Sequence, residues 1–163
     1  MLEVRKATIS DLEGITEIYN DAIKNTVATF DTEIKTLKEQ KQWFKNHGEK
    51  YPIIVAEQDR DIVGWSALSM YSTRCAYSDT VELSLYVTEK DQMKGIGKSL
   101  MKRIIEEGKK AGLHVILARI TDGNKISIHL HEMFGFEHVG VLKEVGYKFD
   151  KCLDVYLMQK ILK

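Results

Sequence analysis

The sequence contains little proline, little cysteine and no excess of charge of either sign, and each shortage excludes a class of protein. One Pro among 163 residues and the lack of any low-complexity run leave no candidate linker between domains. Two cysteines, Cys75 and Cys152, are too few for a disulfide framework and lack the spacing of a metal site. We therefore expect one domain, residues 1–163, without a metal and in a reducing compartment.

The charges balance, because 24 Lys and Arg residues are matched by 24 Asp and Glu residues. A protein that binds the phosphate backbone needs a net basic face, so we expect no nucleic acid partner. The N-terminus lacks the apolar core of a signal peptide, and no apolar run is long enough to span a membrane. The composition, 44% hydrophobic and 29% charged, therefore predicts a soluble cytoplasmic protein without a membrane partner.

What the sequence does contain is a strand–turn–helix signal over residues 80–100. Residues 80–87 alternate and are rich in Val, Leu, Tyr and Thr, which predicts a strand, and the polar segment 88–94 predicts a turn. A helical pattern opens at Gly95. The first N–H groups of a helix have no internal partner, and Gly95 and Gly97 leave room for an anion to approach them. This segment therefore indicates a phosphate-binding turn.

Two well-known phosphate-binding motifs each fail here by one residue. The Walker motif has Gln92 in place of its first Gly, and the dinucleotide motif has Leu100 in place of its third Gly. What remains is Q-x-x-G-x-G over residues 92–97, which resembles the acetyl-CoA pyrophosphate loop of the GNAT superfamily of N-acetyltransferases. An ordinary strand–turn–helix junction, with glycines for packing, is the alternative.

The rest of the chain predicts an α+β domain with a mixed central sheet. Capping boxes at Ser10–Glu13 and Thr36–Glu39 open two helices, and Gly112 and Gly135 end two others. The predicted strands cover residues 2–8, 53–56, 62–70, 80–87, 114–120, 136–142 and 152–161, and the helices cover residues 11–24, 36–47, 95–112 and 124–134. The order β-α-α-β-β-β-α-β-α-β-β is also the order expected of the GNAT fold.

Three stretches make the resemblance more specific. They are R-C-A-Y with T-V-E-L-S-L-Y-V at 74–87, N-K-I-S-I-H-L-H-E-M-F-G-F at 124–136, and V-G-V-L-K-E-V-G-Y-K-F-D-K-C-L-D-V at 139–155. Together they resemble the phosphinothricin N-acetyltransferase branch of the superfamily, which also implies a homodimer. Glu89, Met93 and Cys152 stand where that branch usually has Pro, Gly and Trp. The first two leave the main-chain donors of the loop available, whereas Cys152 alters the expected acceptor pocket.

The resemblance implies that acetyl-CoA lies between strands 80–87 and 114–120, which splay apart. Main-chain groups of Leu85, Tyr86 and Val87 would hold the pantetheine arm, and the Val87 N–H would polarise the thioester; an ordinary core strand is the alternative. Asn124 and Ser127 would bind the pantetheine amides. The loop expected to hold the pyrophosphate consists of Gln92, Met93, Lys94, Gly95, Ile96, Gly97 and Lys98.

Two residues are candidates for the acid–base chemistry. Glu82 is a carboxylate inside an otherwise apolar strand, so it is a general base for the amine, a member of a buried ion pair or an exposed edge residue. His131 shares one helix face with Asn124 and Ser127, and the resembled branch carries His there as a proton donor to the thiolate. A solvated surface His is the alternative.

The acceptor site is expected to involve Phe30, Arg74, Tyr77 and Lys148, each of which is otherwise an ordinary loop or core residue. Arg74 would bind a carboxylate in bidentate fashion, and the two aromatic rings would wall an apolar slot. The resemblance thus predicts N-acetylation of a small amino-acid-like amine in a ternary complex. Two alternatives remain, an acetyltransferase for a polyamine, antibiotic or protein N-terminus, and a CoA-binding module without turnover.

Overall fold

A seven-stranded mixed sheet organises the protein, for which a computed structural model describes all 163 residues. The strand order is β1-β2-β3-β4-β5-β7-β6, and only the pair β4 and β5 is parallel. The strands are β1 (Leu2–Lys6), β2 (Ile53–Gln58), β3 (Asp61–Met70), β4 (Thr80–Val87), β5 (Val115–Thr121), β6 (Glu137–Lys148) and β7 (Lys151–Ile161). This is the α+β order that the sequence predicts, so the predicted fold class is confirmed.

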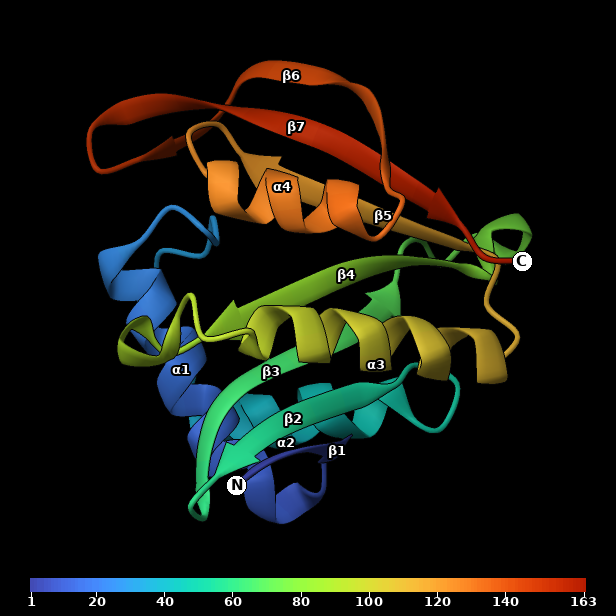
Figure 1. The fold of residues 1–163 in the computed structure, drawn as a ribbon. Helices are drawn as coiled ribbons and strands as arrows, with labels where there is room; N and C mark the ends of the chain where they lie inside the picture. The colour runs from blue at the N-terminus through green and yellow to red at the C-terminus, as the bar shows by residue number, and fades with distance from the viewer.

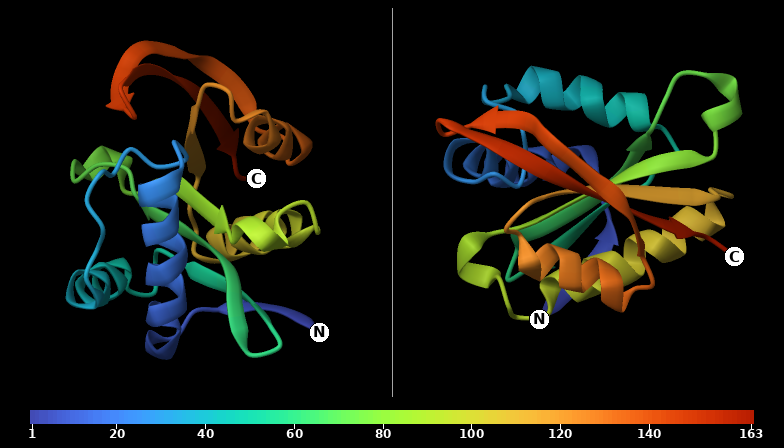
Figure 2. Two further views of the ribbon diagram at one scale, coloured as in Figure 1. Left: turned by 90° about the vertical axis from the view of Figure 1, so that its left-hand side faces the viewer. Right: turned by 90° about the horizontal axis from the view of Figure 1, so that it is seen from above.

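The helices cover both faces of the sheet (Figures 1 and 2). They are α1 (Leu12–Asn25), α2 (Leu37–His47), α3 (Ile96–Lys110) and α4 (Lys125–Met133), with short 3-10 turns η1 (Ile9–Asp11), η2 (Cys75–Tyr77) and η3 (Glu89–Asp91). Helices α1 and α2 lie on one face, and α3 and α4 lie on the other. No helix is both long enough and apolar enough to cross a membrane.

Each face of the sheet has its own apolar core. Val81, Leu100 and Ile104 belong to the larger core under α3, whereas Ile15 and Trp65 belong to the smaller core under α1. Because side chains alternate along a strand, β4 directs its odd-numbered residues toward α3 and its even-numbered residues toward α1. Glu82 therefore lies on the α1 face, and this position decides which side of the sheet carries its chemistry.

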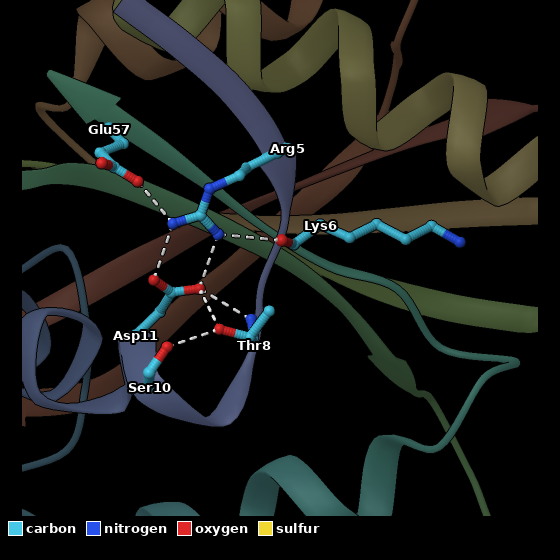
Figure 3. A network of polar contacts seen from close by, with 6 residues as sticks. All are labelled: Arg5, Lys6, Thr8, Ser10, Asp11 and Glu57. Carbon is cyan, nitrogen blue, oxygen red and sulfur yellow. Dashed lines mark hydrogen bonds and ion pairs between the residues drawn. The ribbon is translucent and has the colours of Figure 1, made fainter. Parts of the chain in front are cut away.

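The start of α1 differs from the sequence expectation. The capping box that forms is Thr8–Asp11, at the beginning of η1, and not Ser10–Glu13. Figure 3 shows the reason, since Arg5 pairs with both oxygens of Asp11 and with Glu57 and so holds that carboxylate against the Thr8 N–H. The Thr36–Glu39 capping box forms as predicted.

Strand β6 is longer than predicted. Residues 145–148, which the sequence assigns to a connection, continue the strand after a bulge at which the pairing shifts from Leu142–Val155 to Gly146–Leu153. The bulge is held by Asp154, which accepts a hydrogen bond from the Glu144 N–H at 2.8 Å. A bulge breaks the alternation of side chains along a strand. The alternating pattern of apolar residues therefore does not reveal that β6 continues beyond it.

Candidate active site

Strands β4 and β5 separate after three residue pairs. Their parallel ladder runs from Thr80–Val115 to Glu82–Leu117, but β4 continues to Val87 and β5 continues, paired only with β7, to Thr121. Figure 1 shows the two strands diverging toward their carboxyl ends. The splay expected between these strands is therefore present.

The main chain of β4 offers hydrogen-bonding groups to this opening. The Tyr71 N–H donates to the Thr80 carbonyl and the Thr88 N–H donates to the Val63 carbonyl, so even-numbered residues of β4 bond to β3. Antiparallel pairing alternates, so the N–H and C=O groups of Leu85 and Val87 point away from β3. They lie beyond the end of the ladder with β5 and face the opening between the strands.

Tyr86 has a different environment from its two neighbours. By the same alternation its main chain belongs to the ladder with β3, and its ring packs against Tyr19 and Trp65. Its hydroxyl donates to the Ala28 carbonyl at 3.4 Å, and burial raises the pKa of this phenol to about 12. Of the three residues predicted to hold the pantetheine arm, two have main-chain groups toward the opening.

The N-terminus of α3 lies open beside the splay. Gly95 has a φ of 85°, and no side chain caps the helix. The first helical bond is from the Ser99 N–H to the Gly95 carbonyl, so the N–H groups of residues 96–98 have no helical partner. Gly97 lies between the side chains of Leu85 and Leu130, which brings β4, α3 and α4 together here.

The turn before α3 is held by its own polar contacts. Asp91 accepts from the Thr88 hydroxyl at 2.6 Å and pairs with Lys94 at 3.0 Å, and the Gln92 amide lies 3.5 Å from the Val87 carbonyl. Lys94 is thus partly neutralised, whereas Lys98 is exposed and has no such partner. Met93 has a positive φ of 62° and an exposed side chain. The turn is therefore preformed for main-chain binding of an anion.

Helix α4 joins the three predicted polar residues in one hydrogen-bonded row. The Asn124 side chain caps the helix by accepting from the Ser127 N–H at 3.2 Å, and Nδ1 of His131 lies 2.6 Å from the Ser127 carbonyl. Burial lowers the pKa of His131, whose ring also packs edge-on against Phe136. The neutral ring therefore donates from Nδ1 and accepts at Nε2, which suits a proton acceptor better than the predicted proton donor.

Glu82 forms an ion pair with Arg119 of β5. Nε of Arg119 donates to Oε1 at 2.7 Å and Nη2 donates to Oε2 at 2.5 Å, and this pairing raises the pKa of the guanidinium. The sequence allowed an ion pair at Glu82 but did not identify the partner. The available signal was an Arg inside the strand predicted at 114–120, which is as unusual there as Glu82 is in its own strand.

The candidate acceptor residues lie at two ends of the α1 face. Phe30 lies in the loop after α1, and Lys148 of β6 contacts that loop. The buried Lys148 ammonium donates to the Thr29 carbonyl at 2.8 Å, and burial lowers its pKa. Tyr77 lies in the loop between β3 and β4 and packs edge-on against Tyr71 at 5.3 Å. Arg74, in the same loop, is exposed. The Glu82–Arg119 pair lies on the strands between these two loops.

An open helix N-terminus beside splayed strands places an anion site next to main-chain groups that can bind an extended ligand. A family model described as "Acetyltransferase (GNAT) domain" matches residues 4–157. The chain therefore belongs to the GNAT family of acetyltransferases, whose co-substrate is acetyl-CoA.

Several relatives are similar over almost their whole length. The L-methionine sulfoximine/L-methionine sulfone acetyltransferase of Pseudomonas aeruginosa is 37% identical, covering 96% of this chain and 92% of that protein. A phosphinothricin acetyltransferase from Sinorhizobium meliloti, solved with acetyl-CoA, is 34% identical with a TM-score of 0.95, over 99% of this chain and 88% of that one. A ribosomal-protein-alanine N-acetyltransferase structure from Brucella melitensis is 38% identical with a TM-score of 0.95, over 98% and 99%.

Proposed function

We propose that this chain acts as a single domain that transfers acetyl from acetyl-CoA to the α-amine of a small amino-acid-like acceptor. The acceptor is of the phosphinothricin, methionine sulfoximine or methionine sulfone type. The observation that carries the proposal is that main-chain groups of Leu85 and Val87 face the opening beside the uncapped N-terminus of α3, with the Glu82 side chain on the α1 face of β4. The names of the relatives support this class of acceptor.

The residues present fit the co-substrate. The N–H groups of residues 96–98, with the turn from Gln92 to Gly95, would hold the diphosphate of CoA, aided by the charge of Lys98. Main-chain groups of Leu85 and Val87 would pair with the pantetheine arm, and the Val87 N–H would polarise the thioester carbonyl. Since the Asn124 oxygen caps α4, its amide nitrogen and the Ser127 hydroxyl are the groups left for the pantetheine amides.

The acid–base residues then act on the acceptor. Glu82 would take one proton from the acceptor ammonium, directly or through water, and leave a neutral amine. The nitrogen attacks the carbonyl carbon, the C–N bond forms, and the C–S bond breaks. Nε2 of His131 would accept the second proton from nitrogen and pass it to the sulfur. Neither Cys75 in η2 nor Cys152 in β7 belongs to an element that borders the splay, which supports direct transfer in a ternary complex.

A thiol-release assay with acetyl-CoA and a panel of amines tests the proposal. The panel holds L-methionine sulfone, L-methionine sulfoximine, phosphinothricin, a polyamine, an aminoglycoside and a peptide with N-terminal alanine. We expect release with the first three acceptors. Release only with the other amines contradicts the acceptor class, and CoA binding without release by any amine contradicts the catalytic assignment.

One comparison favours a second candidate function. The structure from Brucella melitensis carries the name of a ribosomal-protein-alanine N-acetyltransferase, which implies an acceptor at a protein N-terminus. A peptide acceptor has an amide where an amino acid has its carboxylate. Preference of the enzyme for the alanyl peptide over free amino acids in the same panel would support this second function.

The proposal includes a cytoplasmic homodimer. β6 is an edge strand and leaves Val139, Val145 and Tyr147 exposed, which supports an interface between copies. Cys75 and Cys152 are free and exposed, which fits a reducing compartment. An enzyme that acetylates phosphinothricin would also give its host resistance to that herbicide. Light scattering after gel filtration tests the dimer, which a single monomeric mass at high concentration would contradict.

A further inference from the structure

Arg119 occupies a distinctive position in the splay. The parallel ladder ends at Glu82–Leu117, and Arg119 is the next residue of β5 whose side chain projects on that same face. Its two hydrogen bonds to Glu82 span the divergence of the strands and fix the plane of the guanidinium. A positive and a negative group are thus presented together, beside the main-chain groups that face the opening.

The guanidinium still has donors for a ligand. Only Nε and Nη2 bond to Glu82, and Nη1 donates to no protein atom. The Arg119 side chain is 59% exposed, whereas the side chain of Glu82 is 25% exposed. Lys148 offers no comparable group, because its ammonium is buried and bonded to the Thr29 carbonyl. Arg119 is therefore both oriented and accessible.

Resting on the proposed function, we propose that Arg119 binds the α-carboxylate of the acceptor while Glu82 faces its α-ammonium. An amino-acid head group carries these two opposite charges on two groups attached to the same carbon atom, and the ion pair presents their complement. An Arg held in one orientation binds a carboxylate with less loss of side-chain freedom than a mobile one. Arg74, the carboxylate ligand expected from sequence, is exposed on a loop and no contact of its side chain fixes it.

The test compares two acceptors that differ only at the carboxylate, L-methionine sulfone and its α-carboxamide. We expect Arg119→Gln to raise the KM for the acid about 10- to 100-fold, the range for a lost hydrogen bond to a charged group. kcat/KM for the carboxamide should change by less than about threefold, so the preference for the acid disappears. Arg119→Lys should keep part of the preference, because the charge remains. Arg60→Gln, which removes an exposed Arg from the β2–β3 turn, is the matched control and should behave as wild type.

Three outcomes overturn the inference. Equal losses with both acceptors in Arg119→Gln would mean that Arg119 acts only through Glu82 or through folding. A preference kept in Arg119→Gln and lost in Arg74→Gln would place the carboxylate at Arg74. A wild-type enzyme that uses the carboxamide as well as the acid would remove the basis for a carboxylate site and leave the acetyltransferase activity standing. Calorimetry of the binding of the acid and of the carboxamide to the enzyme with CoA makes the same comparison without turnover. A loss of acceptor binding is thereby distinguished from a loss of the acetyltransferase reaction.

Discussion

The ring of Phe30 lies directly on the Cα atom of Gly146, so that a Cβ at this glycine would overlap the ring. Phe30 belongs to the loop of residues 26–35 after α1, and Gly146 belongs to β6. The same loop bonds through its Val27 carbonyl to Thr121 of β5 and through its Ala28 carbonyl to Tyr86 of β4. It therefore connects the two strands that the splay separates.

Gly146→Ala tests whether this loop shapes the acceptor site. The added methyl group must displace the Phe30 ring, so we expect a several-fold higher KM for the acceptor, an unchanged affinity for CoA and a loss of about 1–3 kcal/mol of stability. Gly140→Ala, on the same strand with open space around its Cβ position, is the matched control. Steady-state kinetics and urea unfolding measure both effects.

The mechanism of this effect can be separated from a general weakening of β6. In the double variant Phe30→Ala with Gly146→Ala, the methyl group no longer meets a ring, so the two changes should be less than additive. Full additivity of the two stability losses would show that the contact between these residues is not the source.

Gly95→Ala tests the role of the α3 N-terminus. Gly95 has a φ of 85°, and an alanine there is strained by about 1–3 kcal/mol, which displaces the free N–H groups. We expect a large loss of CoA affinity but little effect on a short acetyl thioester that lacks the diphosphate. Gly112→Ala at the other end of α3 is matched, because its φ is 75° and nothing crowds its Cβ position. Equal loss of CoA binding in both variants would assign the effect to helix stability.

Glu82→Gln tests the proton-accepting role. The amide keeps the size of the side chain but accepts a proton poorly, so we expect kcat to fall about 10²- to 10⁴-fold, with CoA affinity nearly unchanged. Glu3→Gln, at an exposed position of β1, removes one carboxylate elsewhere and serves as control. A large loss of CoA affinity with turnover intact would contradict the assigned role.

Local patterns predict those parts of the fold whose cause lies within a few residues. The Thr36–Glu39 box, the start of α3 at Gly95 and its end before Gly112 each follow from neighbours along the chain. The partner of Glu82 does not, because the contact with Arg119 depends on the register between β4 and β5 and on the residue at which they separate. Sequence patterns place residues on a face of one element but do not align two elements.

The start of α1 and the length of β6 illustrate the same limit. Ser10–Glu13 and Thr8–Asp11 both fit the capping pattern, and the choice is made by Arg5, which lies on β1 and holds Asp11 (Figure 3). In β6, the carboxylate of Asp154 on the neighbouring strand stabilises a bulge that no pattern within β6 records. In both cases a contact between elements overrides the local preference.

The buried histidines predict how stability depends on pH. Burial lowers the pKa values of His131 and His47 in the folded protein below the ordinary value of 6.5. Between pH 6.5 and those lowered values the unfolded chain binds more protons than the folded one, so the free energy of unfolding falls as pH falls, by up to about 1.4 kcal/mol per pH unit for each His. His131→Asn should reduce this slope, whereas His129→Asn, at an exposed position on the same helix, should not. Urea unfolding from pH 7.5 to 5.0 measures the slope whatever the absolute stability of each variant. An identical slope in wild type and His131→Asn would show that the ring is not held neutral by burial, and would remove the basis for Nε2 as a proton acceptor.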